Sequence, residues 1–402
     1  MTYAPIHPSI AHLDAHVLDD LVAAYLSGAP AATIIQRFKI NIASSRLRSV
    51  IPLKIANQIC KACGEGMVQG LPPRGSFAGV RGVIRCLACR HELAAACRCP
   101  YCRLQVARRL EAERAIRLIK IKEAIATEDD KYPTWDGTFD DLPLSVAVSY
   151  LALCRCCQPD EQQLCAPLDS SDIPFAPTSS LLEEMVQSLQ KSGLISLSDR
   201  SSPDAFQLDA NGIVYDPGKV RWQLRAEASL AFISVVESAG RTGSWPARWG
   251  EEVADAWMLI AMAECRQYFD HCAQQRGFHC DSDHAIAVML MNLLQDMSVA
   301  QCYRAIWFGA RAAADFLVRS RCSRPHAANY MIGACQRWAD HARAECWDVV
   351  PFKRNFDLPR SMISYVLFDV ILRIGECGFT EPIGKMYQSR EDGGPASGEI
   401  PN

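Results

Sequence analysis

The stretch that decides the fold is residues 60–102, which reads CKACGEGMVQGLPPRGSFAGVRGVIRCLACRHELAAACRCPYC. Six of its seven cysteines form three Cys-x-x-Cys pairs: Cys60 and Cys63, Cys86 and Cys89, and Cys99 and Cys102. Two thiolates spaced in this way bind one metal ion from a tight turn, and two such pairs complete a tetrahedral zinc site. Isolated core cysteines have no reason to take this spacing three times in succession, so the segment predicts structural zinc.

The first two pairs predict one closed site. Twenty-two residues separate them, which is the spacing of a zinc ribbon. The segment between them, residues 70–82, is rich in glycine and arginine and is expected to form a hairpin loop, with residues 80–85 as the strand that leads to Cys86. The predicted zinc-binding part of the chain is residues 56–103.

The third pair lacks two ligands. The candidates are side chains that offer sulfur or nitrogen: Cys97, His91, and a distant cluster that comprises Cys154, Cys157 and Cys165. We take Cys154 and Cys157 as the expected partners, because they form a fourth Cys-x-x-Cys pair. The alternative is that they lie on an apolar helix, residues 142–157, where cysteine is an ordinary small core residue. One or two zinc ions per chain are expected.

Composition indicates a folded, multidomain protein of the cytoplasm. The chain has 402 residues, of which 49% are hydrophobic and 22% charged, and a chain of this length is expected to form two to four domains. It shows no apolar run of eighteen residues and no signal peptide at its first methionine, so neither membrane insertion nor export is expected. Nineteen cysteines in such a chain favour metal ligands over disulfides.

The charges are segregated along the chain. Residues 1–128 hold 18 Lys and Arg against 9 Asp and Glu, whereas residues 129–402 hold 24 against 36. The basic part also carries the cysteine pairs, which suggests that it binds a polyanion, with duplex DNA the expected partner. The acidic part is expected to fold by itself or to bind a protein partner.

Upstream of the cysteines, residues 1–55 show a helix-turn-helix pattern. Apolar residues recur at helical spacing over residues 13–26, and a short second helix is expected over residues 31–38. A turn at residues 39–41 leads to a third helix over residues 42–50, which Pro52 ends. The alternative interpretation is a three-helix bundle with a solvated polar face.

The stretches 25–28 and 34–40 of this pattern resemble the helix-turn-helix of bacterial resolvases and transposases, with Ile35 and Lys39 where that family has alanine and glycine. The resemblance implies that the third helix enters the major groove. It offers these side chains to DNA: Asn41, Ser44, Ser45, Arg46 and Arg48. The hairpin loop adds candidate phosphate contacts at Arg74, Arg81 and Arg85.

The segment from His91 to Cys102 is similar to the zinc-finger region of TniQ-type transposition proteins, in which a histidine and a Cys-Pro-x-Cys pair flank an apolar segment. This resemblance covers fewer than twenty residues. It implies recognition of a target site on DNA.

The remaining chain predicts a mainly α protein with small β elements. Residues 104–130 read as a basic connecting helix, with Arg108 and Arg114 as candidate phosphate contacts or as a solvated surface. Residues 140–225 resemble a winged-helix domain in their order of helices and short strands, and residues 226–380 read as an all-helical domain. Residues 388–402, rich in glycine, are expected to be a disordered tail.

No catalytic motif is found, so an enzyme is not expected. The chain lacks a Gly-x-Ser-x-Gly elbow, a dinucleotide fingerprint and a zinc-deaminase signature. The leading expectation is a zinc-dependent bacterial DNA-binding protein, either a transcription regulator or a target-recognition subunit of a mobile-element or defence system. The alternative is an adaptor whose zinc modules are structural and whose helical domain binds a partner enzyme. Homo-oligomers are compatible with both.

Overall fold

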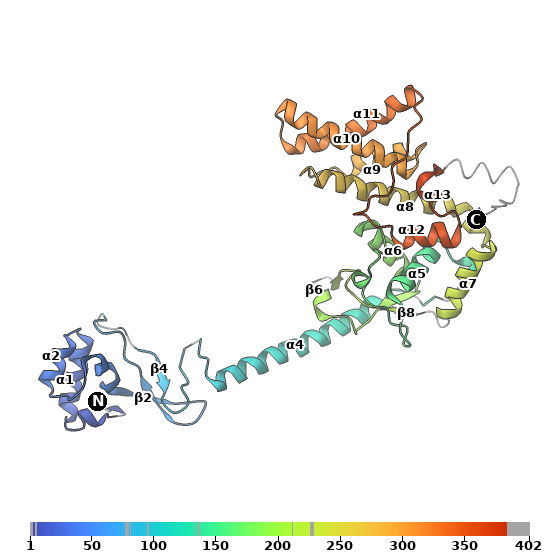
Figure 1. Cartoon of the computed structure of the whole chain (residues 1–402). Helices are drawn as coiled ribbons and strands as arrows, with labels where there is room; N and C mark the ends of the chain where they lie inside the picture. The colour runs from blue at the N-terminus through green and yellow to red at the C-terminus, as the bar shows by residue number, and fades with distance from the viewer. Residues whose placement is uncertain are drawn as a thin grey trace, which may run out of the picture. The chain divides into compact units, whose positions relative to one another are not determined.

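The computed structural model describes residues 3–4, 6–76, 80, 82–94, 96–132, 134–135, 137–210, 212–225 and 229–383. These residues are mainly α-helical with small antiparallel sheets, as predicted (Figure 1). The chain divides into two compact units, Met1–Arg117 and Leu118–Asn402, which we call unit 1 and unit 2. The predicted tail, residues 388–402, lies outside the described residues.

Unit 1 begins with two helices around a small apolar core. Helix α1, Ala15–Leu26, starts after Asp14, whose carboxylate accepts hydrogen bonds from two backbone N–H groups of the first turn. Helix α2, Ala31–Arg37, follows. Their buried faces meet in a cluster that includes Leu21 and Ile34, both almost fully buried, since apolar residues recur at helical spacing.

The expected third helix over residues 42–50 is shorter than predicted. Ala43 is extended, Ser44–Arg46 form one 3₁₀ turn (η2), and α3 comprises only Leu47–Val50. Neither segment has a side-chain cap, and Pro52 follows at once, so nothing extends the helix in either direction. The turn before it contains Lys39 in the left-handed region, with φ of 50°.

A four-stranded antiparallel sheet completes the first half of unit 1. Its strands are β1 (Tyr3–Ala4), β2 (Leu53–Ile59), β3 (Gly66–Gln69) and β4 (Ile84–Cys86), in that order across the sheet. Met67 pairs with Cys86 between β3 and β4. The sheet therefore brings the β2–β3 turn close to the end of β4. The strand expected over residues 80–85 is shorter than predicted, since β4 begins only at Ile84, and it ends at Cys86.

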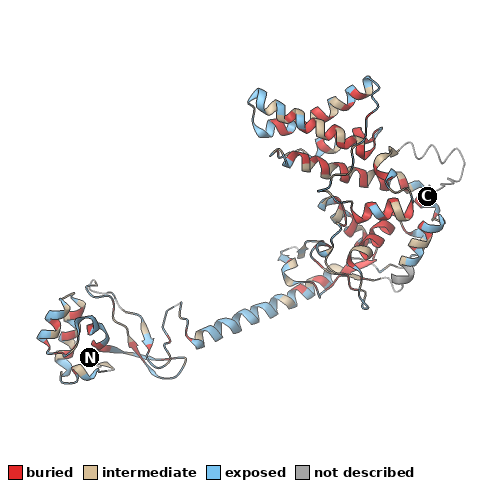
Figure 2. Ribbon diagram, viewed as in Figure 1, coloured by how far each residue is buried: buried red, intermediate tan, exposed pale blue. Residues whose placement is uncertain are grey.

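Helix α4, Pro100–Asp129, is the predicted connecting helix, and it starts four residues earlier than expected. Figure 2 shows it exposed along most of its length. Leu110 is 60% exposed and Ile119 58%, and burial begins only near Ile121 and Ile125. Its charged and apolar residues alternate around the whole helix, so no single apolar stripe is available for packing.

The first part of unit 2 joins two helices and two small two-stranded sheets. Its elements are α5 (Leu144–Cys157), α6 (Ser179–Lys191), β5 (Ile195–Leu197), β6 (Phe206–Asp209), β7 (Gly212–Tyr215) and β8 (Trp222–Leu224). Strand β5 pairs with β8 and β6 with β7, both antiparallel. Trp222 is fully buried, and its indole N–H donates to the Pro217 carbonyl oxygen, so the ring satisfies its one polar atom inside the core.

The second part of unit 2 is helical. Its elements are α7 (Ser229–Thr242), α8 (Ala247–Gln274), α9 (Asp283–Leu294), α10 (Val299–Ser320), α11 (Arg324–Ala344), α12 (Met362–Tyr365), the π-helix Val366–Ile371 and α13 (Cys377–Thr380). A capping box between Ser298 and Gln301 starts α10. Within the described ranges, no helix combines the length and apolar character that crossing a membrane requires.

Candidate metal centres

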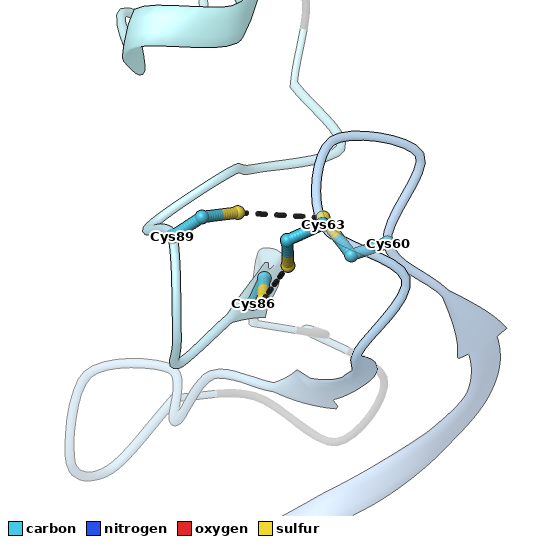
Figure 3. Close-up of side chains that lie close together, drawn as sticks. All are labelled: Cys60, Cys63, Cys86 and Cys89. Carbon is cyan, nitrogen blue, oxygen red and sulfur yellow. Dashed lines mark hydrogen bonds between the residues drawn. The ribbon is translucent and has the colours of Figure 1, made fainter.

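The first ligand group is formed by the four cysteines of the predicted ribbon (Figure 3). Cys60 Sγ lies 3.4 Å from Cys89 Sγ, and Cys63 Sγ lies 3.4 Å from Cys86 Sγ. A disulfide needs about 2.05 Å between sulfurs, whereas the edges of a tetrahedron of thiolates around one zinc ion measure about 3.8 Å. The distances therefore fit four thiolates around one metal ion.

Backbone amides support this first group. The N–H of Ala62 donates to Cys60 Sγ over 3.4 Å, in the tight turn that Gly64 closes with φ of 80°. In the second turn, the backbone N–H of Cys89 lowers the pKa of the Cys86 thiol to about 7. Because metals bind the thiolate, these N–H groups favour the ligand form of the cysteines.

The second ligand group comprises one histidine and three cysteines, all drawn from twelve residues of sequence. His91 Nδ1 lies 3.7 Å from Cys97 Sγ, 3.5 Å from Cys99 Sγ and 3.3 Å from Cys102 Sγ. Around one tetrahedral zinc ion a nitrogen and a sulfur ligand lie about 3.6 Å apart. The four atoms within this group are thus placed as a metal would hold them.

Local structure also prepares the second group. The Glu92 N–H donates to Cys97 Sγ over 3.2 Å, and the Cys102 N–H, in the first turn of α4, donates to Cys99 Sγ over 3.4 Å. Backbone N–H groups, first that of Cys99 and then that of Glu92, lower the pKa of the Cys97 thiol to about 6. His91 is buried, so its ring is held in place against the three sulfurs.

The expected ligands Cys154 and Cys157 do not belong to either group, and that prediction is corrected. Both lie on α5, which is buried on nearly all sides in the apolar core of unit 2. Each is only 6% exposed and belongs to the apolar cluster of that core. Both are core residues of an apolar helix, which was the alternative interpretation of the sequence.

His91 and Cys97 are the ligands that the sequence reasoning placed only among the candidates. A signal for them exists in the local pattern His-x5-Cys-x-Cys-x2-Cys, since ligands close in sequence need no long chain reversal. The two groups are also linked directly. The Cys86 N–H donates to the His91 carbonyl oxygen over 2.7 Å, so the turn between the two groups is held by backbone hydrogen bonds.

The residues proposed to contact nucleic acid lie at the surface of unit 1. Those that the structure describes are all exposed: Asn41, Ser44, Ser45, Arg46, Arg48, Arg74, Arg85, Arg108 and Arg114. Arg81 lies outside the described residues. Within the described ranges the arginines of this set form no ion pair, although Arg109 pairs with Glu113. Their charge is therefore not neutralised by carboxylates of unit 1.

The arginines of unit 2 contrast with this. Several pair with carboxylates: Arg155 with Glu237, Arg225 with Asp129, Arg248 with Glu252, Arg266 with Asp270, Arg343 with Asp296, Arg354 with Glu264 and Arg360 with Asp369. With Arg319, which pairs with Asp315, eight of the eighteen arginines described in unit 2 form ion pairs, and the other ten form none among the described residues.

Comparison with protein-family models, with curated proteins and with solved structures finds no match for the chain. The two ligand groups and the exposed arginines of unit 1 are therefore the observations that bear on function.

Proposed function

We propose that the chain is a zinc-dependent DNA-binding protein, acting as a transcription regulator or as the target-recognition subunit of a bacterial mobile-element or defence system. The observation that carries the proposal is the excess of exposed basic residues in the first part of the chain. Residues 1–128 hold 18 Lys and Arg against 9 Asp and Glu, whereas residues 129–402 hold more acidic than basic residues. The candidate arginines of unit 1 that the structure describes are exposed and form no ion pair among the described residues. Unpaired guanidinium groups attract the phosphates of duplex DNA and release the counterions that surround them.

Zinc is the proposed metal because of the donor sets. Four thiolates, or three thiolates and one imidazole, are the ligand sets of closed structural zinc sites. Around the first group the apolar core is very small, with Cys60, Met67 and Cys86 as its buried members. A core of this size does not stabilise a fold alone, so metal binding supplies the missing free energy.

The finer architecture belongs to the same proposal. Helices α1 and α2 with the Ser44–Val50 segment are proposed as a helix-turn-helix, since Lys39 adopts the left-handed conformation at the position where resolvases have glycine. Helices α5 and α6 with the two small sheets are proposed as a winged-helix-like module. Its acidic composition favours packing or protein binding over contact with phosphates.

Electrophoretic mobility shift with the full zinc-loaded chain and with two fragments tests the proposal. A fragment ending near Asp130 is expected to bind duplex DNA, with affinity that falls as salt rises. The fragment beginning near Asp140 is expected to show no shift, because the excess of basic residues lies wholly in the first fragment. Equal binding by the two fragments would contradict the charge argument.

Arg46→Ala tests whether the third segment reads bases. Because Arg46 is exposed at the end of η2, its loss is expected to weaken binding to a preferred site by about 1 to 3 kcal/mol and to relax specificity. Arg114→Ala on α4 is the comparison, expected to weaken all sequences alike and to reduce the salt dependence. Anisotropy titrations of both variants on specific and scrambled duplexes measure this. If Arg46→Ala binds the preferred site as tightly as the wild type, residues 1–55 do not read bases and the alternative of a three-helix bundle is favoured.

A second candidate function, an adaptor that docks a partner enzyme, is favoured by one face of α10 and α11. Aromatic rings there are partly exposed and stack across the two helices, Phe308 on Trp338 and Phe316 on Tyr330. The Arg337 guanidinium lies 4.7 Å from the centre of the Tyr330 ring. Trp, Tyr and Arg are the residues that dominate protein interfaces. Zinc retention without any shift of DNA by the full chain would favour this function.

A further inference from the structure

We propose that a cleft between the two metal-ligand groups binds one phosphodiester of a nucleic-acid backbone. This inference rests on the proposed DNA-binding function and identifies a contact site other than the third helical segment. An open cleft of about 620 Å³ lies in unit 1, lined by Cys89 of the first group and by Cys97 and Cys99 of the second. Three arginines also line it, namely Arg90, Arg98 and Arg103.

Each of these arginines is placed by a metal ligand beside it in the sequence. Arg90 follows Cys89 directly, with φ of 59°, and its N–H donates to the Cys86 carbonyl oxygen over 3.1 Å. Arg98 lies between Cys97 and Cys99. Arg103 follows Cys102 in the first turn of α4. Metal binding at both groups therefore fixes the backbone positions of all three arginines around the cleft.

The three guanidinium groups are available to a ligand. All three residues are exposed, and none forms an ion pair among the described residues. Glu92 is the single carboxylate in the lining of the cleft, and its backbone N–H donates a hydrogen bond to Cys97 Sγ. A planar guanidinium presents paired N–H donors that match two oxygens of a phosphate, so three of them around one cleft form a phosphate-binding arrangement.

The charge balance favours an anionic ligand. Residues 60–108, which hold the ligands of both groups, contain eight Lys and Arg against two Glu. Seven thiolates around two divalent ions contribute a net charge of three negative units, since the ligands bind deprotonated. The segment therefore stays positive by three units when both metals are bound. That excess attracts the phosphodiester backbone of a nucleic acid.

A backbone contact of this kind carries no base information, so it adds affinity for every sequence. The competing role for the arginines is to compensate the thiolate charge of the metal groups. The two roles differ in what a charge-removing variant loses. A phosphate site loses nucleic-acid affinity at constant zinc content, whereas thiolate compensation predicts loss of zinc.

The test uses the full zinc-loaded chain and the triple variant Arg90→Gln/Arg98→Gln/Arg103→Gln. The matched control is Arg319→Gln/Arg321→Gln/Arg324→Gln, three exposed arginines of unit 2. Fluorescence anisotropy is measured with a duplex DNA, a single-stranded DNA and an RNA of the same sequence over a series of salt concentrations. The triple variant is expected to bind about tenfold more weakly, with a salt slope smaller by about 0.9, the value for one phosphate contact. The control is expected to match the wild type.

Several outcomes separate the inference from the proposed function. Equal loss on all three probes supports a shared phosphodiester site, and loss on RNA alone assigns the site to RNA. If the wild type binds DNA and the affinity of the triple variant is within twofold of it, the proposed phosphate site in the cleft is overturned. The proposed DNA-binding function then still stands. Absence of wild-type binding overturns both. Should the glutamine variant lose zinc, the triple lysine variant decides, because lysine keeps the charge: affinity within about threefold of wild type supports the site, and a tenfold loss overturns it.

Discussion

Purified without chelator, the protein is expected to contain two zinc ions per chain, and removing them is expected to unfold the segment around residues 53–102. Each group supplies four ligands within 4.8 Å of one another, and no large apolar core supports either. Structural zinc contributes apparent binding free energies of about 10 to 16 kcal/mol at neutral pH, which is lost on chelation. Elemental analysis and limited proteolysis, before and after a strong chelator, measure the two parts of this expectation.

Serine variants assign each metal ion to its group. Cys60→Ser and Cys99→Ser are each expected to lower the content to one zinc per chain, because each removes one ligand from a different group. Cys154→Ser is the control and is expected to retain two, since Cys154 is a core residue of α5. A loss of zinc in Cys154→Ser would restore the pairing with Cys99 and Cys102. Less than one zinc in the wild type would contradict both sites.

Arg354→Ala is expected to destabilise unit 2 by about 3 to 5 kcal/mol, because it leaves a buried carboxylate without its counter-ion. Arg354 Nη1 lies 3.0 Å from Glu264 Oε1, whose side chain is 3% exposed. The same guanidinium lies 4.1 Å from the centre of the Phe379 ring and also pairs with Glu376. It therefore ties the segment after α11 to both α8 and α13. Urea unfolding followed by tryptophan fluorescence measures the change.

A matched control separates burial from loss of an arginine in general. Arg319 pairs with Asp315 at the surface of α10, so Arg319→Ala is expected to change the free energy of unfolding by less than about 1 kcal/mol. The double variant Glu264→Gln/Arg354→Met is expected to recover part of the lost stability, since it removes the uncompensated charge. If Arg354→Ala and Arg319→Ala lowered the free energy of unfolding equally, burial of Glu264 would add nothing to the cost of losing its partner.

Local sequence patterns were enough for several elements. Helices α6 and α10 follow their apolar spacing, and Ser298 with Gln301 has the sequence pattern of the capping box that starts α10. The ligand set of the first metal group followed from two cysteine pairs. These features depend on contacts within a few residues or on the spacing that metal ligands require. They can therefore be predicted from the sequence alone.

Other features were not readable in this way. The third segment, residues 42–50, has the composition of a helix but forms one 3₁₀ turn and four α-helical residues, because helix length depends on capping and on the chain that follows. The all-helical pattern expected over residues 226–380 is interrupted near its end by a π-helix at Val366–Ile371 and a left-handed Gly375. The ion pair between Glu264 and Arg354 joins residues ninety positions apart.

The sequence by itself determined that this protein has metal-binding cysteine pairs, a basic first part and a mainly helical remainder, because residue type and spacing encode ligand chemistry, charge and periodicity directly. Only the tertiary structure decided which side chains complete the second metal group. His91 and Cys97 reach Cys99 and Cys102 because the turn after β4 folds back on itself, while Cys154 and Cys157 are taken into a core. A tetrahedral metal ion needs four ligand atoms around one point, and the path of the backbone determines which side chains supply them.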